Sequence, residues 1–188
     1  MSLLVDYGLD SPARSLPILA LSLKDRNDQT TMGIMHIQKV MRYFEYLSGK
    51  GQIEFSHYKF GAVSYELMEN IETLEDCGLV EEPEKDHLRL TALGSDIVSD
   101  VRSIVGDEDV RRLAFAKTQL NDLPLDELMF FMYKLLPETR EHSTQAETLE
   151  KRKVPLSGSL FMKGRINSVT AGKWSGMTEK QFLASLSK

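Results

Sequence analysis

Side chains able to read DNA gather near the C-terminus, between Lys163 and Gln181. Lysine and arginine bind phosphate, lysine also reaches guanine, and glutamine can pair with adenine through two hydrogen bonds. The candidate contacts with duplex DNA are Lys163, Arg165, Lys173, Thr178, Lys180 and Gln181. Glu179 lies among them and is unfavourable to DNA, although an acid also suits the beginning of a helix. This segment is therefore a candidate DNA-contacting surface.

Three short helices are expected to position these side chains, over 156–163, 168–175 and 178–187. A helix-turn-helix needs a small residue where its two helices meet and a turn residue that tolerates positive φ. Ala171-Gly172 and Gly176 stand at suitable places for these two needs. The apolar seam would consist of Trp174, Met177, Phe182, Leu183 and Leu186. The alternative is a helical hairpin whose cations only add solubility.

The distribution of charge divides the chain in two. Its net charge is −5, but residues 1–150 hold 15 Lys and Arg against 27 Asp and Glu, a net charge of −12. Residues 151–188 hold 8 Lys and Arg against one acid, a net charge of +7. Such asymmetry is typical of a tail that binds nucleic acid. It equally fits a basic tail that docks on the acidic body, and composition leaves both interpretations open.

The body shows the element order of a winged helix-turn-helix. A first helix begins near Ser11 or only at Pro17, and a second spans 34–47 and ends at Gly49. After a strand-like piece, a third helix ends at Gly78, and a hairpin around Pro83 leads to a helix capped by Thr91. The inner face of that last helix would hold Leu93, Ile97, Val101 and Ile104.

The predicted fold class is mainly α with a small β-hairpin. Further helices are expected over 107–120 and 125–136. Residues 138–154 are polar with few apolar anchors, and we interpret them as a linker or a loosely held helix. We therefore predict a winged-helix body with additional helices over 1–137, a polar linker over 138–155, and a small basic helix-turn-helix unit over 156–188.

The helix before the hairpin is acidic where a DNA-reading helix would be basic. Its exposed stripe would consist of Glu66, Glu69, Glu72, Glu75 and Asp76, opposite the apolar Leu67, Ile71 and Leu74. DNA carries one negative charge per roughly 1.7 Å of its axis and should be repelled. Only Lys85, His87 and Arg89 on the wing favour DNA. We expect this helix to serve partner binding or dimerisation through Glu66, Glu69, Glu72 and Glu75.

Nothing in the residue pattern indicates catalysis or a cofactor. The four histidines occur singly, without the spacing of a metal site, and no phosphate-binding glycine loop is present. Cys77 is the only cysteine, which excludes an intrachain disulfide. The longest apolar run near the start, "PILALSL", is far shorter than a membrane span. We expect a cytoplasmic protein that is not an enzyme, has no metal or cofactor, and carries no signal peptide.

Segments of the body resemble the YwgA-like and Panacea-type (SocA-like) winged-helix proteins over about 33–137. The similar stretches are "MHIQKVMRYFEYL", "YKFGAVSYELMENIETLEDCGLVEE", "LRLTALG" and "LPLDELMFFMYKLLPE". Gly61-Ala62 replaces the Gly-Pro usual in those proteins, and Leu136-Pro137 ends the last motif. The resemblance implies a winged-helix fold.

The tail, "SLFMKGRINSVTAGKWSGMTEKQFLASL", resembles a family of small predicted prokaryotic antitoxins with a helix-turn-helix. The coinciding residues are Gly164, Ser168, Ala171, Gly176, Phe182, Leu183 and Leu186. This sequence departs from the pattern at Gly172, Trp174 and Gln181. Both families are associated with toxin–antitoxin or phage-linked loci, which implies a prokaryotic, antitoxin-like regulator.

Two functions follow as expectations. The first is a DNA-binding transcriptional regulator, a homodimer whose body mediates association while the C-terminal helix-turn-helix contacts DNA. The second is an interaction protein, an antitoxin or adaptor that binds a toxin or another protein through the acidic winged helix and does not bind DNA.

Overall fold

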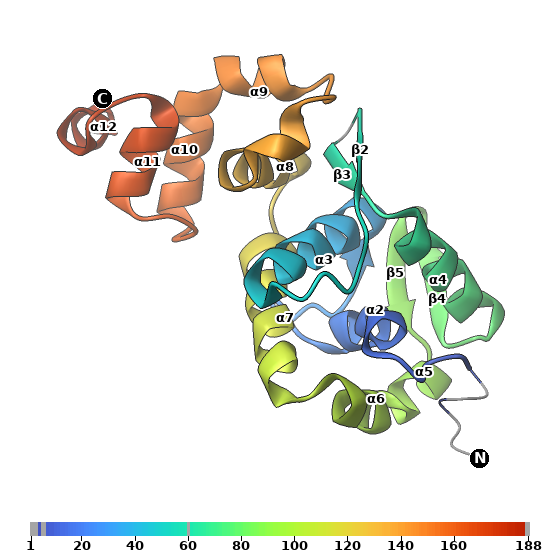
Figure 1. Ribbon diagram of the computed structural model, residues 1–188. Helices are drawn as coiled ribbons and strands as arrows, with labels where there is room; N and C mark the ends of the chain where they lie inside the picture. Colours follow the sequence, from blue (N-terminus) through green and yellow to red (C-terminus); the bar gives the residue numbers. More distant parts are fainter. Residues whose placement is uncertain (1–3, 5–6, 60, 187–188) are drawn as a thin grey trace. The chain divides into compact units, whose positions relative to one another are not determined.

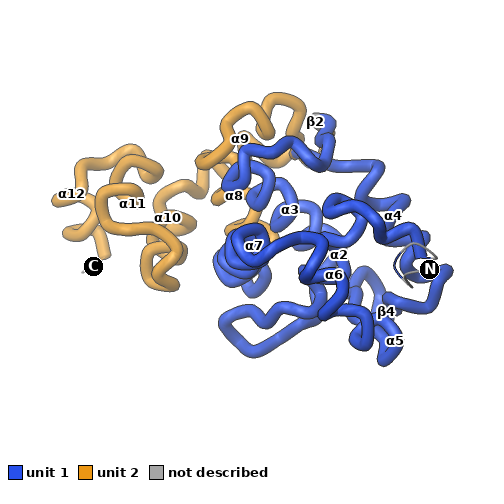
Figure 2. The backbone as a smooth tube through the Cα atoms, turned by 60° about the horizontal axis from the view of Figure 1, so that its bottom comes forward, with its two compact units in different colours: residues 1–56, 62–122 blue, residues 57–61, 123–188 orange. Residues whose placement is uncertain are grey.

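Helices make up most of the computed structural model, which describes every residue except 1–3, 5–6, 60 and 187–188, and the side chain of His57 (Figure 1). The chain divides into two compact units (Figure 2): residues 1–56 with 62–122, and residues 57–61 with 123–188. None of the described helices is long and apolar enough to span a bilayer.

Helix α2 (Pro12–Ser22) forms the centre of the first unit. Its residues from Ser15 to Leu21 are buried, and it packs against α4 (Tyr65–Asp76), α6 (Val98–Val105) and α7 (Asp107–Leu120). The Ser11 side chain accepts a hydrogen bond from the Arg14 N–H and caps the helix. The helix therefore begins at Pro12, and Pro17 lies inside it.

A three-stranded antiparallel sheet has the order β1 (Met32–Gly33), β5 (His87–Leu90), β4 (Val80–Glu84). Met32 pairs with Leu88, and Val80 pairs with Leu90. Strands β4 and β5 form the hairpin predicted around Pro83. Helix α3 (Ile34–Ser48) follows β1 directly and ends at Gly49, as predicted, with φ of 66°. A separate two-stranded sheet pairs β2 (Ser56–Tyr58) with β3 (Gly61–Val63).

The helix predicted after Thr91 is divided in two. Thr91 caps it as expected by accepting from the Gly94 N–H, but α5 (Ala92–Asp96) ends at Ile97, where α6 begins. A Cβ atom on Gly94 would lie 2.0 Å from the Leu79 carbonyl oxygen, so the first turn abuts the start of the hairpin. With Gly94 facing inward, Leu93 points outward and is 43% exposed. The prediction that Leu93 belongs to the inner face was wrong.

Two lysines are buried in the first unit, and sequence reasoning did not anticipate either. The Lys117 ammonium donates to the carbonyl oxygens of Ala20 at 2.8 Å and Thr30 at 2.6 Å. Burial lowers the pKa of Lys117 to about 7, although Asp25 nearby acts in the opposite direction. Lys39 donates to the Ala62 carbonyl oxygen at 2.7 Å, and burial lowers its pKa to about 8.

In the described part of the second unit, the regular secondary structure outside 57–61 is helical. Its elements are α8 (Leu125–Leu135), a 3₁₀ turn over Pro137–Arg140, α9 (Ala146–Lys151), α10 (Lys153–Met162), α11 (Ser168–Ser175) and α12 (Glu179–Ser185). Residues 138–155, predicted as a linker or a loosely held helix, contain most of the 3₁₀ turn, all of α9 and the start of α10. Leu149 is buried and Lys134 donates to Glu150 at 2.8 Å, and these contacts hold α9 on α8.

The unit boundary also differs from the one predicted at 137. Helix α8 belongs with the C-terminal helices because its Phe130 and Phe131 rings both pack on the Trp174 ring in T-shaped geometry. Their centroids lie 6.1 and 5.5 Å from that of Trp174. The packing of these aromatic side chains from distant parts of the sequence was not visible in the local pattern.

Candidate nucleic-acid interface

Helices α11 and α12 meet at very short range. A Cβ atom on Gly172 would lie 3.0 Å from the Glu179 backbone nitrogen and 3.1 Å from the Met177 carbonyl oxygen, so a larger residue would push the helices apart. The turn between them begins at Gly176, which has φ of 77°, a left-handed conformation that glycine adopts without strain. Glycine thus fills both places where the sequence pattern required a small or permissive residue.

An apolar seam fixes the two helices on their neighbours. Ala171 and Phe182 are fully buried, and the Phe182 ring meets Phe161 of α10 edge to face, with centroids 5.6 Å apart. Trp174 anchors α11 on α8. Leu183 and Leu186, predicted in the seam, are 42% and 41% exposed, so these two lie at its edge. The interhelical geometry is therefore set by a small aromatic core.

Four of the predicted DNA contacts lie exposed on α11 and at the start of α12: Lys173, Thr178, Lys180 and Gln181. Two of these form a capping box. The Thr178 hydroxyl oxygen accepts from the Gln181 N–H, and the Thr178 N–H donates to Gln181 Oε1 at 2.9 Å. Because that oxygen is already used, the capped Gln181 can offer a base only its amide N–H groups, not the paired contact expected with adenine.

Lys163 and Arg165 occupy different surroundings from the other four. The Lys163 ammonium donates to Glu127 of α8 at 2.7 Å, and Ser159 donates to the same carboxylate at 2.8 Å. Arg165 is only 8% exposed. Its backbone N–H donates to the Leu160 carbonyl oxygen at the C-terminal end of α10. Neither side chain is presented to DNA as openly as Lys173 and Lys180.

The second unit remains positive when all its residues are counted. Residues 57–61 and 123–188 hold 11 Lys and Arg against 7 Asp and Glu, a net charge of +4, whereas the first unit holds 12 against 21, a net charge of −9. Part of the basic charge is paired inside the unit. Arg152 donates to Asp126 of α8, and Lys151 pairs with Glu147 at 2.7 Å. Among the described residues, Lys173 of α11 and Lys180 of α12 are exposed and form no ion pair, and the same holds for Arg140 of the 3₁₀ turn.

The acidic stripe on α4 lies where the sequence predicted it. Glu66, Glu69 and Glu72 are exposed, while Leu67 and Ile71 on the opposite side are buried. Glu75 is half-buried, and its pKa is raised by burial and by the like charges of neighbouring carboxylates, which are Glu82, Glu72 and Asp76. We call Glu66, Glu69, Glu72, Glu75 and Glu82 the acidic face.

The hairpin residues that were predicted to form a wing do not offset this negative charge. Arg89 donates to Glu81 at 2.7 Å, so its charge is met within the hairpin. His87 is exposed, and its Nδ1 lies 3.0 Å from the Lys85 carbonyl oxygen. Lys85 is exposed at the turn, beside Asp86. The three wing residues predicted as weak DNA contacts therefore stand among acids.

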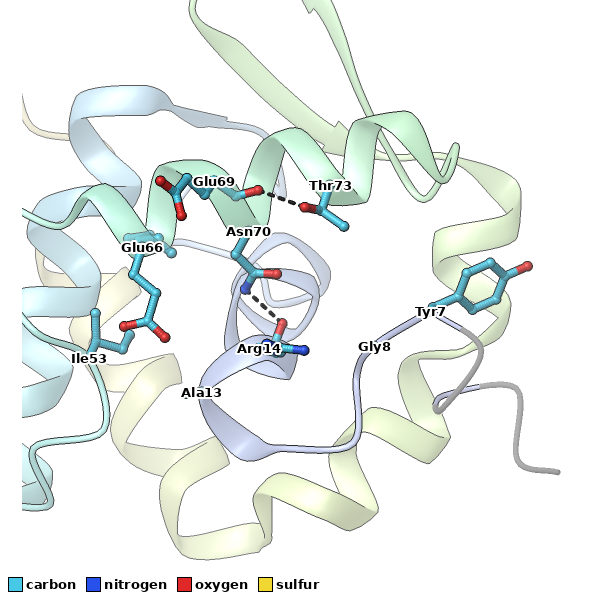
Figure 3. Close-up of a pocket in the computed structure, with 10 residues that line it drawn as sticks. Tyr7, Gly8, Ala13, Arg14, Ile53, Glu66, Glu69, Asn70 and Thr73 are labelled. Carbon is cyan, nitrogen blue, oxygen red and sulfur yellow. Dashed lines mark hydrogen bonds between the residues drawn. The ribbon is translucent and has the colours of Figure 1, made fainter.

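A pocket of about 230 Å³ lies between α4 and the start of α2 (Figure 3). Glu66 and Asn70 extend from α4 towards it, and the Asn70 amide donates to the Arg14 carbonyl oxygen at 3.0 Å. Arg14 contributes the cationic side of the lining, while Ile53 and Leu67 contribute apolar surface. The pocket borders the acidic face and is smaller than the clefts that usually hold a drug-sized ligand.

No protein-family model, curated protein or solved structure matches this chain. The resemblances to winged-helix proteins and to antitoxins therefore stay expectations drawn from short stretches of sequence.

Proposed function

We propose that this protein is a DNA-binding regulator that contacts duplex DNA through α11 and α12. The close crossing of these helices at Gly172 carries the proposal, because it holds them as a rigid pair that presents Lys173 and Lys180 on one positively charged unit. Short helix pairs of this kind present side chains to the major groove in helix-turn-helix proteins. The two lysines bind phosphates, and Gln181 supplies a hydrogen-bond donor.

The winged-helix assignment of the first unit belongs to the same proposal. Support comes from the sheet order β1-β5-β4, with α3 following β1 and α4 preceding the hairpin. In this arrangement α4 occupies the place of a DNA-reading helix, but its exposed carboxylates repel phosphate. We propose that the first unit mediates association and that it does not contact DNA.

Fluorescence anisotropy with a labelled mixed-sequence duplex tests this function. Binding should weaken steeply as salt rises, because each phosphate contact releases a condensed counterion. Replacing Lys173 and Lys180 by alanine should reduce the slope of log K against log salt by about 2, roughly 0.9 for each contact. The matched control, Lys24→Ala with Lys85→Ala, removes two exposed lysines from the first unit and should leave the slope unchanged. Absence of binding at low salt would overturn the proposal.

A second function rests on the acidic face. Its exposed carboxylates form the densest group of like charge on α4 and the hairpin, and they suit a lysine- and arginine-rich protein partner. In that case the protein would act as an antitoxin or adaptor without DNA. Replacing Glu66, Glu69 and Glu72 by lysine would abolish capture of such a partner, while leaving any DNA binding by α11 and α12 intact or stronger.

A further inference from the structure

A shallow groove of about 370 Å³ follows α3 and α7 in the first unit. Leu47 of α3 lines it, together with the α7 residues Glu108, Arg111, Arg112 and Phe115. Neither the DNA-contacting helices nor the acidic face uses this surface. We call Tyr46, Leu47, Glu108, Arg111, Arg112 and Phe115 the α3–α7 face.

Two large aromatic rings are left half in solvent on this face. Tyr46 is 51% exposed and Phe115 is 49% exposed. The buried Tyr43 ring joins them, with its centroid 6.2 Å from that of Tyr46 and 6.2 Å from that of Phe115. A continuous row of rings therefore crosses from α3 to α7. Grouped exposed aromatic side chains of this kind are enriched at protein interfaces.

Of the two arginines beside these rings, Arg112 is paired with carboxylates, and Arg111 has no such partner in the part of the chain that the structure describes. Arg112 donates to Glu108 and, at 2.9 Å, to Asp109. Hydrogen bonds from Lys50 and Arg112 hold the pKa of Asp109 below its ordinary value, even though burial acts to raise it. Arg111 is exposed and forms no ion pair among the described residues. Arg111 is thus an exposed cation, unpaired within the described part of the chain, on the same surface as the two half-exposed aromatic rings.

We propose that the α3–α7 face is the homodimer interface and that a second copy of this chain occupies it. Arg111 and Phe115 lie one helical turn apart on the same side of α7. Two α7 helices packed antiparallel about a two-fold axis between these residues bring each Arg111 guanidinium over the Phe115 ring of the other copy. This cation–π contact occurs twice in the dimer, and each time it gives Arg111 a partner and covers the Phe115 ring. This inference rests on the dimeric association included in the proposed function, and it identifies the α3–α7 face as the surface through which the two copies associate.

Charge favours a second copy at this face and disfavours it at the other surface of the unit. The acidic face would repel its own copy, because like charges brought together cost free energy. Helix α4 lies on the opposite side of α2 from α7 (Figure 1), so two copies joined through α7 keep their acidic faces apart. The α3–α7 face carries both signs of charge, so a second copy related by a two-fold axis can place opposite charges against each other there.

Sedimentation equilibrium of the full chain tests the interface. The unaltered protein should be a dimer that dissociates on dilution, and Phe115→Ser or Arg111→Glu should weaken the dimer at least about tenfold, as expected for a residue central to an interface. Matched controls are Tyr65→Ser, a 58% exposed ring on α4, and Lys85→Glu on the wing, neither of which should change the dimer. Circular dichroism confirms that each variant is folded.

A mixing experiment tests the register directly. In a Cys77→Ser background, the single variants Arg111→Cys and Phe115→Cys should form a disulfide-linked pair far more readily when mixed than either does alone. A monomer at every soluble concentration would overturn the assignment, as would a dimer indifferent to Phe115→Ser and Arg111→Glu. A monomer that still binds duplex DNA would leave the proposed DNA contact standing while removing the dimer and this interface, so the two failures can be told apart.

Discussion

At the scale of single residues, the buried lysines show how much a polar group can depend on its partners. Lys117 is fully buried in α7, yet its ammonium reaches the Ala20 carbonyl in the last turn of α2 and the Thr30 carbonyl of the following connector. Carbonyls at a helix end have no partner within the helix, and the Lys117 amino group supplies one here. Asn121, one turn later, donates to Asp25 of the same connector at 2.8 Å. These bonds fasten the 24–31 connector to α7.

We expect the stability of the protein to fall as pH falls from about 10 to about 7. The unfolded chain binds the Lys117 proton with an ordinary pKa of 10.5, whereas the folded chain binds it only below about 7, so unfolding takes up a proton in this window. The slope from this one group is at most about 1.4 kcal/mol per pH unit. Urea unfolding across the window measures it, and Lys117→Met should flatten the dependence and cost about 1–3 kcal/mol.

Lys39 acts in the same direction, with its folded pKa of about 8, so part of the pH dependence should survive in Lys117→Met. Stability of the unaltered protein that is independent of pH between 7 and 10 would contradict this description of the buried lysines.

At the scale of elements, local signals were sufficient where the cause is local. Thr91 caps its helix as the sequence indicated, and Gly49 and Gly176 end theirs in the left-handed conformation. Ser11 and Thr178 cap their helices as well. The hairpin, its neighbouring helices and the acidic stripe on α4 follow from the same short-range patterns.

Features that depend on distant contacts were not predictable in this way. The outward position of Leu93 depends on the Leu79 carbonyl that faces Gly94, and α8 belongs to the second unit because its rings meet Trp174. The helical character of 138–155 depends on Leu149 and on Lys134, which lie in different elements. The buried lysines could not be predicted either. A lysine among the polar residues of a helix pattern normally indicates the solvent-exposed face.

Glycine replacements test the close contacts between elements. Gly94→Ala should destabilise the protein by more than about 2 kcal/mol, because the new Cβ would collide with a backbone carbonyl that cannot move aside easily. Gly158→Ala is the matched control. Its Cβ would meet only Leu186 at 3.6 Å, so the gain in helix propensity of up to about 1 kcal/mol should leave stability equal or higher. Thermal unfolding of the two variants gives the comparison, and equal effects would contradict the described contact.

The cap of α12 should be separable from its DNA contacts. Thr178→Ala removes the capping box and should lower the free energy of unfolding by about 0.5–2 kcal/mol, with weaker DNA binding as a consequence. Lys180→Ala removes no bond within the chain that holds the helix, so it should reduce DNA affinity at unchanged stability. Denaturant unfolding and anisotropy on both variants would separate the roles, and a destabilised Lys180→Ala would show that this lysine has a structural role.

At the scale of the whole molecule, the two units carry opposite net charges, and this difference bears on which unit DNA can approach. The first unit carries −9 and presents the acidic face, and the second carries +4 with its open cations on α11 and α12. Under the proposed function, DNA is therefore expected to approach the second unit and not the first, whose winged-helix assignment is part of the proposal. The internal pairing of Arg152 and Lys163 with α8 acids limits the expected footprint to a few phosphates.

Site-specific photocrosslinking tests the central claim, DNA contact through α11 and α12, most directly. In a Cys77→Ser background, a cysteine at position 180 or at position 72 is coupled to a photoactivated probe, and each protein is irradiated with a labelled duplex at low salt. We expect a crosslink to DNA from position 180 on α12 and none from position 72 on α4. A crosslink from position 72 alone, or from neither position, would contradict it.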